Sequence, residues 1–266
     1  MITTSWPRWA VALITITVFF VVDTYIWLPF KTFWDPDAVG YHRLLGITLL
    51  RYSPWLLVPL LAAFLFFGPK QALVSLGFNR SLPVAFAFAL LCTSIMTITF
   101  LVTGSFSPPE DLFIEAMTGS FLPGTMEEIF YRAFLFGFLF RFAGMGFLPS
   151  ALLGAIVFGA GHLYQGGSAG EAAGIFAITA TGGLWFAWLY TEWDFNIWVP
   201  ISFHVLMNLI WSLFDVSDTA MGDTAANNAR LGVIVLSIVL TLILSRRGQG
   251  RVISTRGWIW GPPREA

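Results

Sequence analysis

Long apolar runs recur along nearly the whole chain and restrict the folds open to it. A helix needs about 20 apolar residues to cross the roughly 30 Å hydrocarbon core of a bilayer. The pattern predicts about eight such segments, with approximate limits 9–30, 54–67, 82–103, 119–140, 148–164, 171–190, 197–214 and 229–245. With 57% hydrophobic and only 11% charged residues, the chain has too little polar surface for a water-soluble domain. We therefore expect an all-α, polytopic membrane protein.

The distribution of charge predicts one membrane domain and its orientation. No repeat, low-complexity linker or break in composition divides residues 1–266, so a single domain is sufficient. A basic tail at 246–266 holds five arginines, which by the positive-inside rule places the C-terminus in the cytoplasm, and the protein in the inner membrane if its source is bacterial. Segment 31–52 mixes basic residues with leucines and is predicted to lie along the membrane interface. A net charge of −1 favours no nucleic-acid partner.

Few ionisable residues lie inside the predicted membrane segments. Burying such a group in hydrocarbon is costly, so each one is a candidate for function. The candidates are Asp23, Glu127, Glu128, Arg132, His162 and His204.

The run from Glu127 to Arg132 predicts an unequal pair of carboxylates. Glu128 and Arg132 are four residues apart, with the acid first, which is the favourable order for an ion pair on a helix. Glu127 lies about 100° further around the helix. We therefore expect Arg132 to neutralise Glu128 and to leave Glu127 without its own cation, as a candidate for proton transfer.

Two further pairs have helical spacing and could converge on these carboxylates. Phe158 and His162 are four residues apart, as are His204 and Asn208, so each pair lies on one face of its helix. A peptidase without a covalent nucleophile needs a base for water, a partner that orients the water, and donors for the oxyanion. Glu127, then His162, then His204 with Asn208 could fill these roles in that order.

The ordered motifs EExxxR at 127–132, FxxxH at 158–162 and HxxxN at 204–208 resemble those of the CPBP family. This family comprises CAAX prenyl proteases of the second type and bacteriocin-processing enzymes, also called glutamic intramembrane proteases. The resemblance covers roughly 119–214. It implies about eight spans around a catalytic cavity and a membrane-anchored or hydrophobic peptide as substrate. We assign no metal or cofactor to the site. Its implied catalytic residues are Glu127, His162, His204 and Asn208, with Glu128, Arg132 and Phe158 in support.

Two other classes of protein remain open from the residues alone. A zinc protease could assemble a site from two histidines and a glutamate on separate helices, although no HExxH motif is present. A non-enzymatic membrane protein, such as an immunity factor, a scaffold or a transporter, could keep the polar cluster for packing or ion passage. Activity that survives chelation would argue against the first class, and loss of function on changing Glu127 would argue against the second.

Two protease patterns are interpreted as structural features. Residues 166–170 match GxSxG, but a nucleophilic serine in that motif requires a strand–turn–helix setting, so we interpret the stretch as a connection. An aspartyl intramembrane protease needs two aspartates in the membrane, and only Asp23 is convincing. We expect Asp23 to lie at a helix end or to pair internally.

Overall fold

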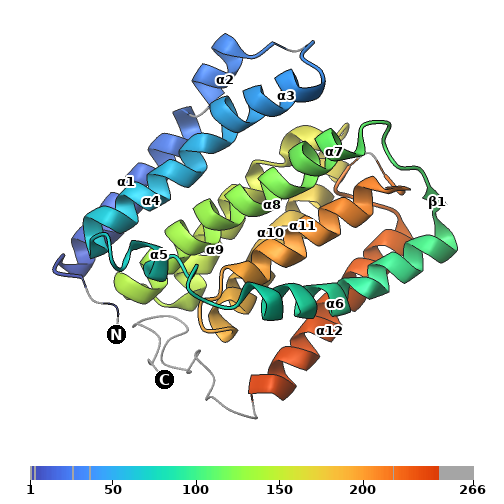
Figure 1. Cartoon of the computed structure of the whole chain (residues 1–266). Helices are drawn as coiled ribbons and strands as arrows, with labels where there is room; N and C mark the ends of the chain where they lie inside the picture. Colours follow the sequence, from blue (N-terminus) through green and yellow to red (C-terminus); the bar gives the residue numbers. More distant parts are fainter. Residues whose placement is uncertain (1, 3, 26, 36, 218, 246–266) are drawn as a thin grey trace.

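Helices form nearly all of the structure, a computed structural model that describes every residue except 1, 3, 26, 36, 218 and 246–266 (Figure 1). The first half contains α1 (Arg8–Tyr25), α2 (Trp27–Phe33), α3 (Gly40–Gly46), the π-helix η1 (Ile47–Tyr52), α4 (Ser53–Phe67), α5 (Ala72–Ser75) and α6 (Leu82–Thr103). The basic tail 246–266 lies outside the described residues, so the orientation predicted from it stays a prediction.

The second half contains the three sequence motifs. A continuous helix, here called the motif helix (residues 112–142), consists of α7 (Leu112–Glu115), η2 (Ala116–Phe121), α8 (Leu122–Glu127), η3 (Glu128–Phe136) and η4 (Phe138–Phe142). It is followed by α9 (Phe147–Ala160), the 3₁₀-helix η5 (Leu163–Gln165), α10 (Ala169–Glu192), α11 (Trp198–Ser212) and α12 (Thr224–Ser245). Two short strands, β1 (Ser105–Phe106) and β2 (Phe214–Asp215), pair in antiparallel fashion and join the ends of α6 and α11.

The helices confirm an all-α, polytopic protein. Each of the eight predicted segments overlaps a helix or a run of consecutive helices. Within the described part of the chain, six helices are long and apolar enough to cross a membrane: Arg8–Tyr25, Gly40–Phe67, Leu82–Thr103, Phe147–Gln165, Ala169–Glu192 and Thr224–Leu244. The helix α11 is shorter, with 15 residues. The motif helix carries the charged residues of the candidate site.

Two predicted segments can be compared with the helices. The first was expected over 9–30; α1 covers Arg8–Tyr25 and α2 covers Trp27–Phe33, and residue 26 between them lies outside the described residues. The expected interfacial segment continues from Gly40 onward directly into α4, as one helix long and apolar enough to cross a membrane. Pro54 lacks a backbone donor, and the π-helical turns of η1 lie immediately before it. A wider turn at this place allows the helix to continue.

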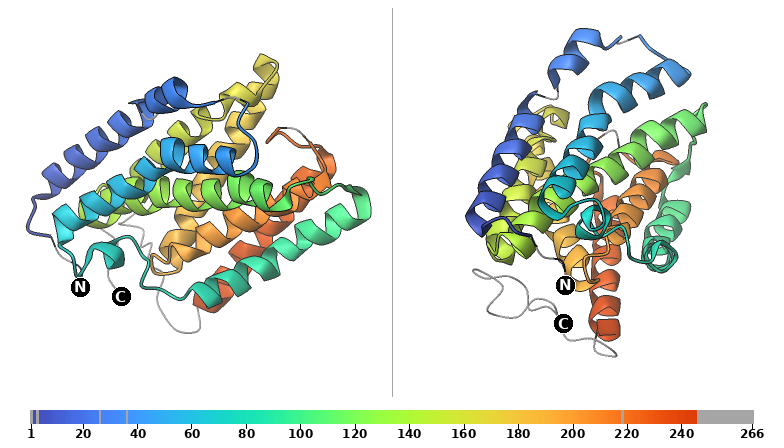
Figure 2. Two further views of the ribbon diagram at one scale, coloured as in Figure 1. Left: turned by 45° about the horizontal axis from the view of Figure 1, so that its top comes forward. Right: turned by 60° about the vertical axis from the view of Figure 1, so that its left-hand side comes forward.

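The motif helix lies between other helices (Figure 2), and its apolar side chains share a core cluster with residues of α1, α4, α9 and α10. Phe19 of α1 and Trp55 of α4 stack on Phe130, with ring centroids 4.7 and 5.3 Å apart. The helices α6, α10 and α11 share a second apolar cluster. Large apolar side chains also point outward, for example Leu61 and Leu101, which are 66% and 64% exposed. Such outward faces suit a lipid environment and cannot be explained by packing within one chain.

A glycine sets the distance between the motif helix and α11. A Cβ atom at Gly124 would lie 2.7 Å from Val205 Cγ2 and 2.8 Å from the Val205 backbone nitrogen. The two backbones therefore approach as closely as a glycine permits. Glu127 follows Gly124 by one turn and His204 precedes Val205, so this contact places the two motif residues opposite each other.

We predict that Gly124→Val lowers the rate of any reaction at this site by about 100-fold, because a displacement of about 1 Å can cost that much. Initial rates of the purified variant and wild-type protein measure the effect. Gly170→Ala is the matched control, since a Cβ at Gly170 meets nothing within 4 Å. Equal rates for Gly124→Val and wild type would show that this contact does not position the site.

Candidate active site

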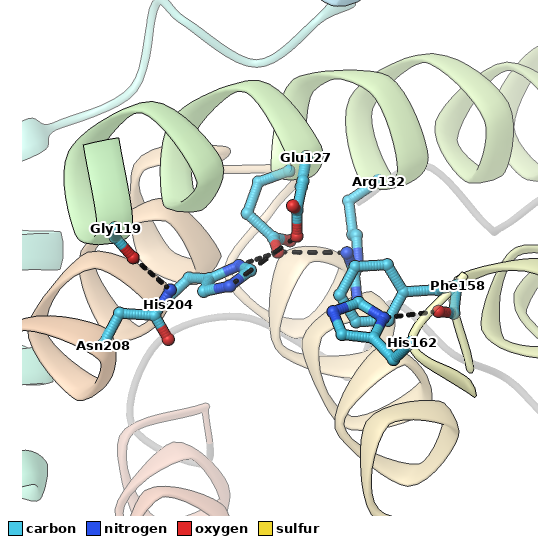
Figure 3. A network of polar contacts seen from close by, with 8 residues as sticks. Gly119, Glu127, Arg132, Phe158, His162, His204 and Asn208 are labelled. Carbon is cyan, nitrogen blue, oxygen red and sulfur yellow. Dashed lines mark hydrogen bonds and ion pairs between the residues drawn. The ribbon is translucent and has the colours of Figure 1, made fainter. Parts of the chain in front are cut away.

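Three separate parts of the chain bring the motif residues together (Figure 3). Glu127 ends α8 and Glu128 begins η3, so both lie near the middle of the motif helix. His204 comes from α11 and faces the two glutamates. On the other side of them, α9 supplies Phe158. The convergence that helical spacing predicted is therefore present for these residues.

Glu128 is fully buried and pairs with two cationic or polar side chains. Its Oε1 lies 3.0 Å from Arg132 Nη1 and 2.7 Å from His204 Nδ1. The predicted pair between Glu128 and Arg132 is confirmed. The Arg132 guanidinium also lies over the rings of Phe158 and Phe186, 4.5 and 5.5 Å from their centroids. Aromatic faces stabilise a guanidinium that has little contact with water.

Glu127 faces the same histidine from the other side. Its Oε2 lies 3.8 Å from His204 Nε2, and its side chain is 8% exposed. From the sequence we expected Arg132 to pair with Glu128 and no cation to lie near Glu127. The first expectation holds, but His204 lies between the two carboxylates and so also faces Glu127. Helical geometry within one segment could not predict this, because His204 belongs to a helix 76 residues away along the chain.

The helix that carries both glutamates is wider than an α-helix at this point. η3 is π-helical from Glu128 to Phe136, whereas the sequence interpretation assumed regular α-helical turns. An angle of about 100° between successive residues, which holds for an α-helix, therefore does not apply from Glu128 to Arg132. Runs of π-helix are rare and frequently mark functional sites.

Asn208 and His162 each have one partner in the backbone. Asn208 Nδ2 donates to the Gly119 carbonyl at 3.2 Å, which leaves its second amide hydrogen available. The His162 Nδ1 lies 2.8 Å from the Phe158 carbonyl. Because a carbonyl oxygen only accepts, Nδ1 carries the proton of this bond, and Nε2 of a neutral ring is an acceptor.

One cavity of about 730 Å³ connects these side chains. Its lining includes Glu127, Phe158, His162, His204 and Asn208. Glu128 and Arg132 do not line it: Glu128 contacts His204, and Arg132 contacts Glu128. The two glutamates thus occupy different positions: one faces the cavity, and the other holds the histidine.

Two cavity residues were missed by the sequence interpretation. Tyr52 is 2% exposed and lies within electrostatic range of Glu127. It lies in the stretch that was assigned to the membrane interface, so nothing connected it with the site. Arg230 also lines the cavity. It lies within the predicted segment 229–245, and the cost of burying an ionisable group could have identified it.

The GxSxG stretch at 166–170 and Asp23 make local structural contacts. Ser168 accepts a hydrogen bond from the Glu171 backbone nitrogen at 3.2 Å and caps α10, in a connection without a strand. Asp23 accepts from the Tyr131 hydroxyl at 2.9 Å, which confirms the expected internal pairing. Among the described residues, no group of three or more His, Cys, Asp or Glu side chains is arranged to hold a metal ion.

A comparison with protein families gives a match over the part of the chain that contains the three motifs. Residues 109–210 match the family described as type II CAAX prenyl endopeptidase Rce1-like. The matched region contains all the motif residues, from Glu127 to Asn208. The predicted resemblance is therefore confirmed over this region. A search of curated proteins gave no match.

Proposed function

We propose, from the match of residues 109–210 to the Rce1-like CAAX endopeptidases, that this integral membrane protein is a glutamic-type intramembrane endopeptidase. It would hydrolyse a peptide bond in a membrane-associated protein or peptide. One observation supports this best: Glu127 and His204 line a single cavity, while Glu128 holds His204 from behind. This arrangement combines a proton acceptor with a fixed donor.

In the proposed reaction, Glu127 is the general base. Its carboxylate removes a proton from a water molecule, and the water oxygen attacks the carbonyl carbon of the substrate. The same proton is then available for the leaving amine when the tetrahedral intermediate collapses. His162, which lines the same cavity, would orient the water through Nε2, the acceptor in its neutral ring.

The oxyanion of the intermediate requires donors that are already in place. His204 donates from Nδ1 to Glu128, so it can donate from Nε2 as well when both nitrogens carry protons. Asn208 has a second amide hydrogen beyond the one bound to Gly119. These two groups come from adjacent turns of α11 and support an oxyanion site on that helix.

The surroundings of the site favour an apolar substrate in the bilayer. Aromatic and sulfur-containing side chains, including Trp185, Phe186 and Met207, line much of the cavity. Such a lining binds apolar peptide side chains or lipid groups better than charged ones. We place the protein in the inner membrane if its source is bacterial, with a cytoplasmic C-terminus, because of the basic tail.

A comparison of peptide termini tests the proposed function. Membranes that contain wild-type protein or Glu127→Ala are incubated in parallel, and new termini are identified by mass spectrometry. We expect termini that require Glu127, in both the presence and absence of a strong chelator. Termini that disappear with the chelator and return with zinc would favour a zinc protease, and the absence of any Glu127-dependent terminus would favour a non-enzymatic protein.

A further inference from the structure

One buried tyrosine in the cavity has a hydroxyl group without a partner in the protein. Tyr52, the last residue of η1, is 2% exposed and lines the cavity together with Glu127. The other buried tyrosines, Tyr131 and Tyr190, each donate to a protein oxygen, at 2.9 and 3.3 Å. Among the described residues, the Tyr52 hydroxyl makes no such bond. A buried tyrosine hydroxyl usually has a partner, so this one is available to a ligand in the cavity.

Aromatic contacts fix the ring of Tyr52. Trp55 meets this ring edge-on, with 5.6 Å between the centroids, and the Arg51 guanidinium lies 5.0 Å from the Tyr52 centroid. Trp55 in turn stacks on Phe130 of the motif helix at 5.3 Å. Phe130 follows Glu127 by three residues of the same helix. The Tyr52 hydroxyl therefore has a set position relative to the Glu127 carboxylate.

Tyr52 and the proposed oxyanion donors come from different sides of α8. This helix, which ends at Glu127, lies between α4 and α11 (Figure 1) and packs against both η1 and α11. Tyr52 belongs to η1, which continues into α4, whereas His204 and Asn208 belong to α11. In a trans peptide the carbonyl and the N–H point in opposite directions. A substrate carbonyl directed toward α11 therefore directs the N–H of the same bond toward η1.

The charge of Glu127 favours one orientation of the Tyr52 hydroxyl. The negative carboxylate acts electrostatically on Tyr52. The hydroxyl hydrogen is therefore drawn toward the carboxylate, and the oxygen lone pairs turn away from it. A phenolic oxygen accepts hydrogen bonds as well as donating them. Its lone pairs are thus free to accept the N–H of a bound peptide.

We infer that Tyr52 is a further catalytic residue, whose hydroxyl oxygen accepts a hydrogen bond from the nitrogen of the cleaved peptide bond. The inference rests on the proposed peptidase function. When the tetrahedral intermediate collapses, the proton that Glu127 took from water passes to this nitrogen and the C–N bond breaks, while Tyr52 keeps its own proton. The N–H becomes a stronger donor once the nitrogen is protonated, so the bond to Tyr52 stabilises the transition state more than the bound substrate.

A matched pair of substrates tests this role. The probes are a peptide that the purified wild-type protein cleaves and the depsipeptide of the same sequence, in which oxygen replaces the N–H of the cleaved bond. Tyr52→Phe should lower kcat for the peptide by about 10- to 100-fold, as for a hydrogen bond to a charged group. Its kcat for the depsipeptide should equal that of wild type, because this leaving group has no hydrogen to donate. Initial rates of the full-length protein in nanodiscs measure both constants, and retained ester hydrolysis also reports a folded site.

Two further variants separate this role from a structural one. Tyr41→Phe makes the same chemical change at an exposed position outside the cavity and should keep both activities. Replacement of Tyr52 by 3-fluorotyrosine keeps the shape of the side chain, weakens its oxygen as an acceptor and strengthens its O–H as a donor. This replacement should lower the rate for the peptide and leave the rate for the depsipeptide unchanged.

Several results would overturn the inference. One is a wild-type rate of peptide cleavage by Tyr52→Phe. Another is an equal loss of both substrates in Tyr52→Phe while 3-fluorotyrosine at this position changes neither rate. A higher peptide rate with 3-fluorotyrosine would assign Tyr52 the role of a donor instead. Failure of the proposed function is recognised separately, because Glu127→Gln would then cleave both substrates as fast as wild type does.

Discussion

Glu127→Gln is expected to lower kcat by about 10²- to 10⁴-fold, which is the usual contribution of a general base. Glutamine keeps the shape of the side chain and its position in the cavity but cannot take a proton from water. KM should change little, because the substrate contacts remain. Steady-state kinetics of the purified protein with a cleaved peptide measure both constants.

The matched control for this variant is Glu110→Gln, which makes the same chemical change at an exposed position outside the cavity. Its kcat and KM should equal those of wild type. The assignment of Glu127 as the base would be wrong if Glu127→Gln kept its kcat, or if only KM rose. The second result would indicate that Glu127 binds substrate without taking part in the chemical step.

Glu128→Leu should lower the free energy of unfolding by about 3–5 kcal/mol, since it leaves Arg132 buried without its carboxylate. The double variant Glu128→Leu/Arg132→Met should be more stable than this single variant, because no unpaired charge remains. Unfolding of the purified proteins in detergent, followed by tryptophan fluorescence, gives the two values. All of these variants should also lose activity, since His204 loses the group that holds Nδ1.

A double-mutant cycle that includes Arg132→Met separates pairing from packing. The destabilisation of the double variant should be smaller than the sum of the two single effects. Simple additivity would contradict the pairing, and it would mean that Glu128 and Arg132 stabilise the fold through independent contacts. Ser168→Ala serves as the reference change, because Ser168 caps α10 away from the cluster.

The helical architecture could be predicted because apolar length alone identifies a membrane span. The predicted limits of the helices differ from the structure where π-helical turns join two segments into one helix. Residues 40–52 carry charges among leucines, which is typical of an interfacial helix. The π-helical turns of η1 instead connect this stretch to α4, and no hydrophobic period reveals such turns.

For the candidate site, spacing within a helix predicted contacts within that helix, and the pair between Glu128 and Arg132 is the example. Contacts between helices depend on packing, for which one sequence gives little information. The approach of α8 to α11 at Gly124 places His204 between both carboxylates, and Tyr52 reaches the cavity from another helix. The resemblance to a family identified the three motifs but gave none of these contacts.

The position of His204 between Glu127 and Glu128 has a consequence for the charge of the buried cluster. With both histidine nitrogens protonated, the two carboxylates and the two cations, His204 and Arg132, sum to zero. When Glu127 takes a proton from water, the negative charge moves to the tetrahedral oxygen, and the total is unchanged. The proposed hydrolysis then requires no ion to enter or leave a region of low dielectric constant, where an uncompensated charge is most costly.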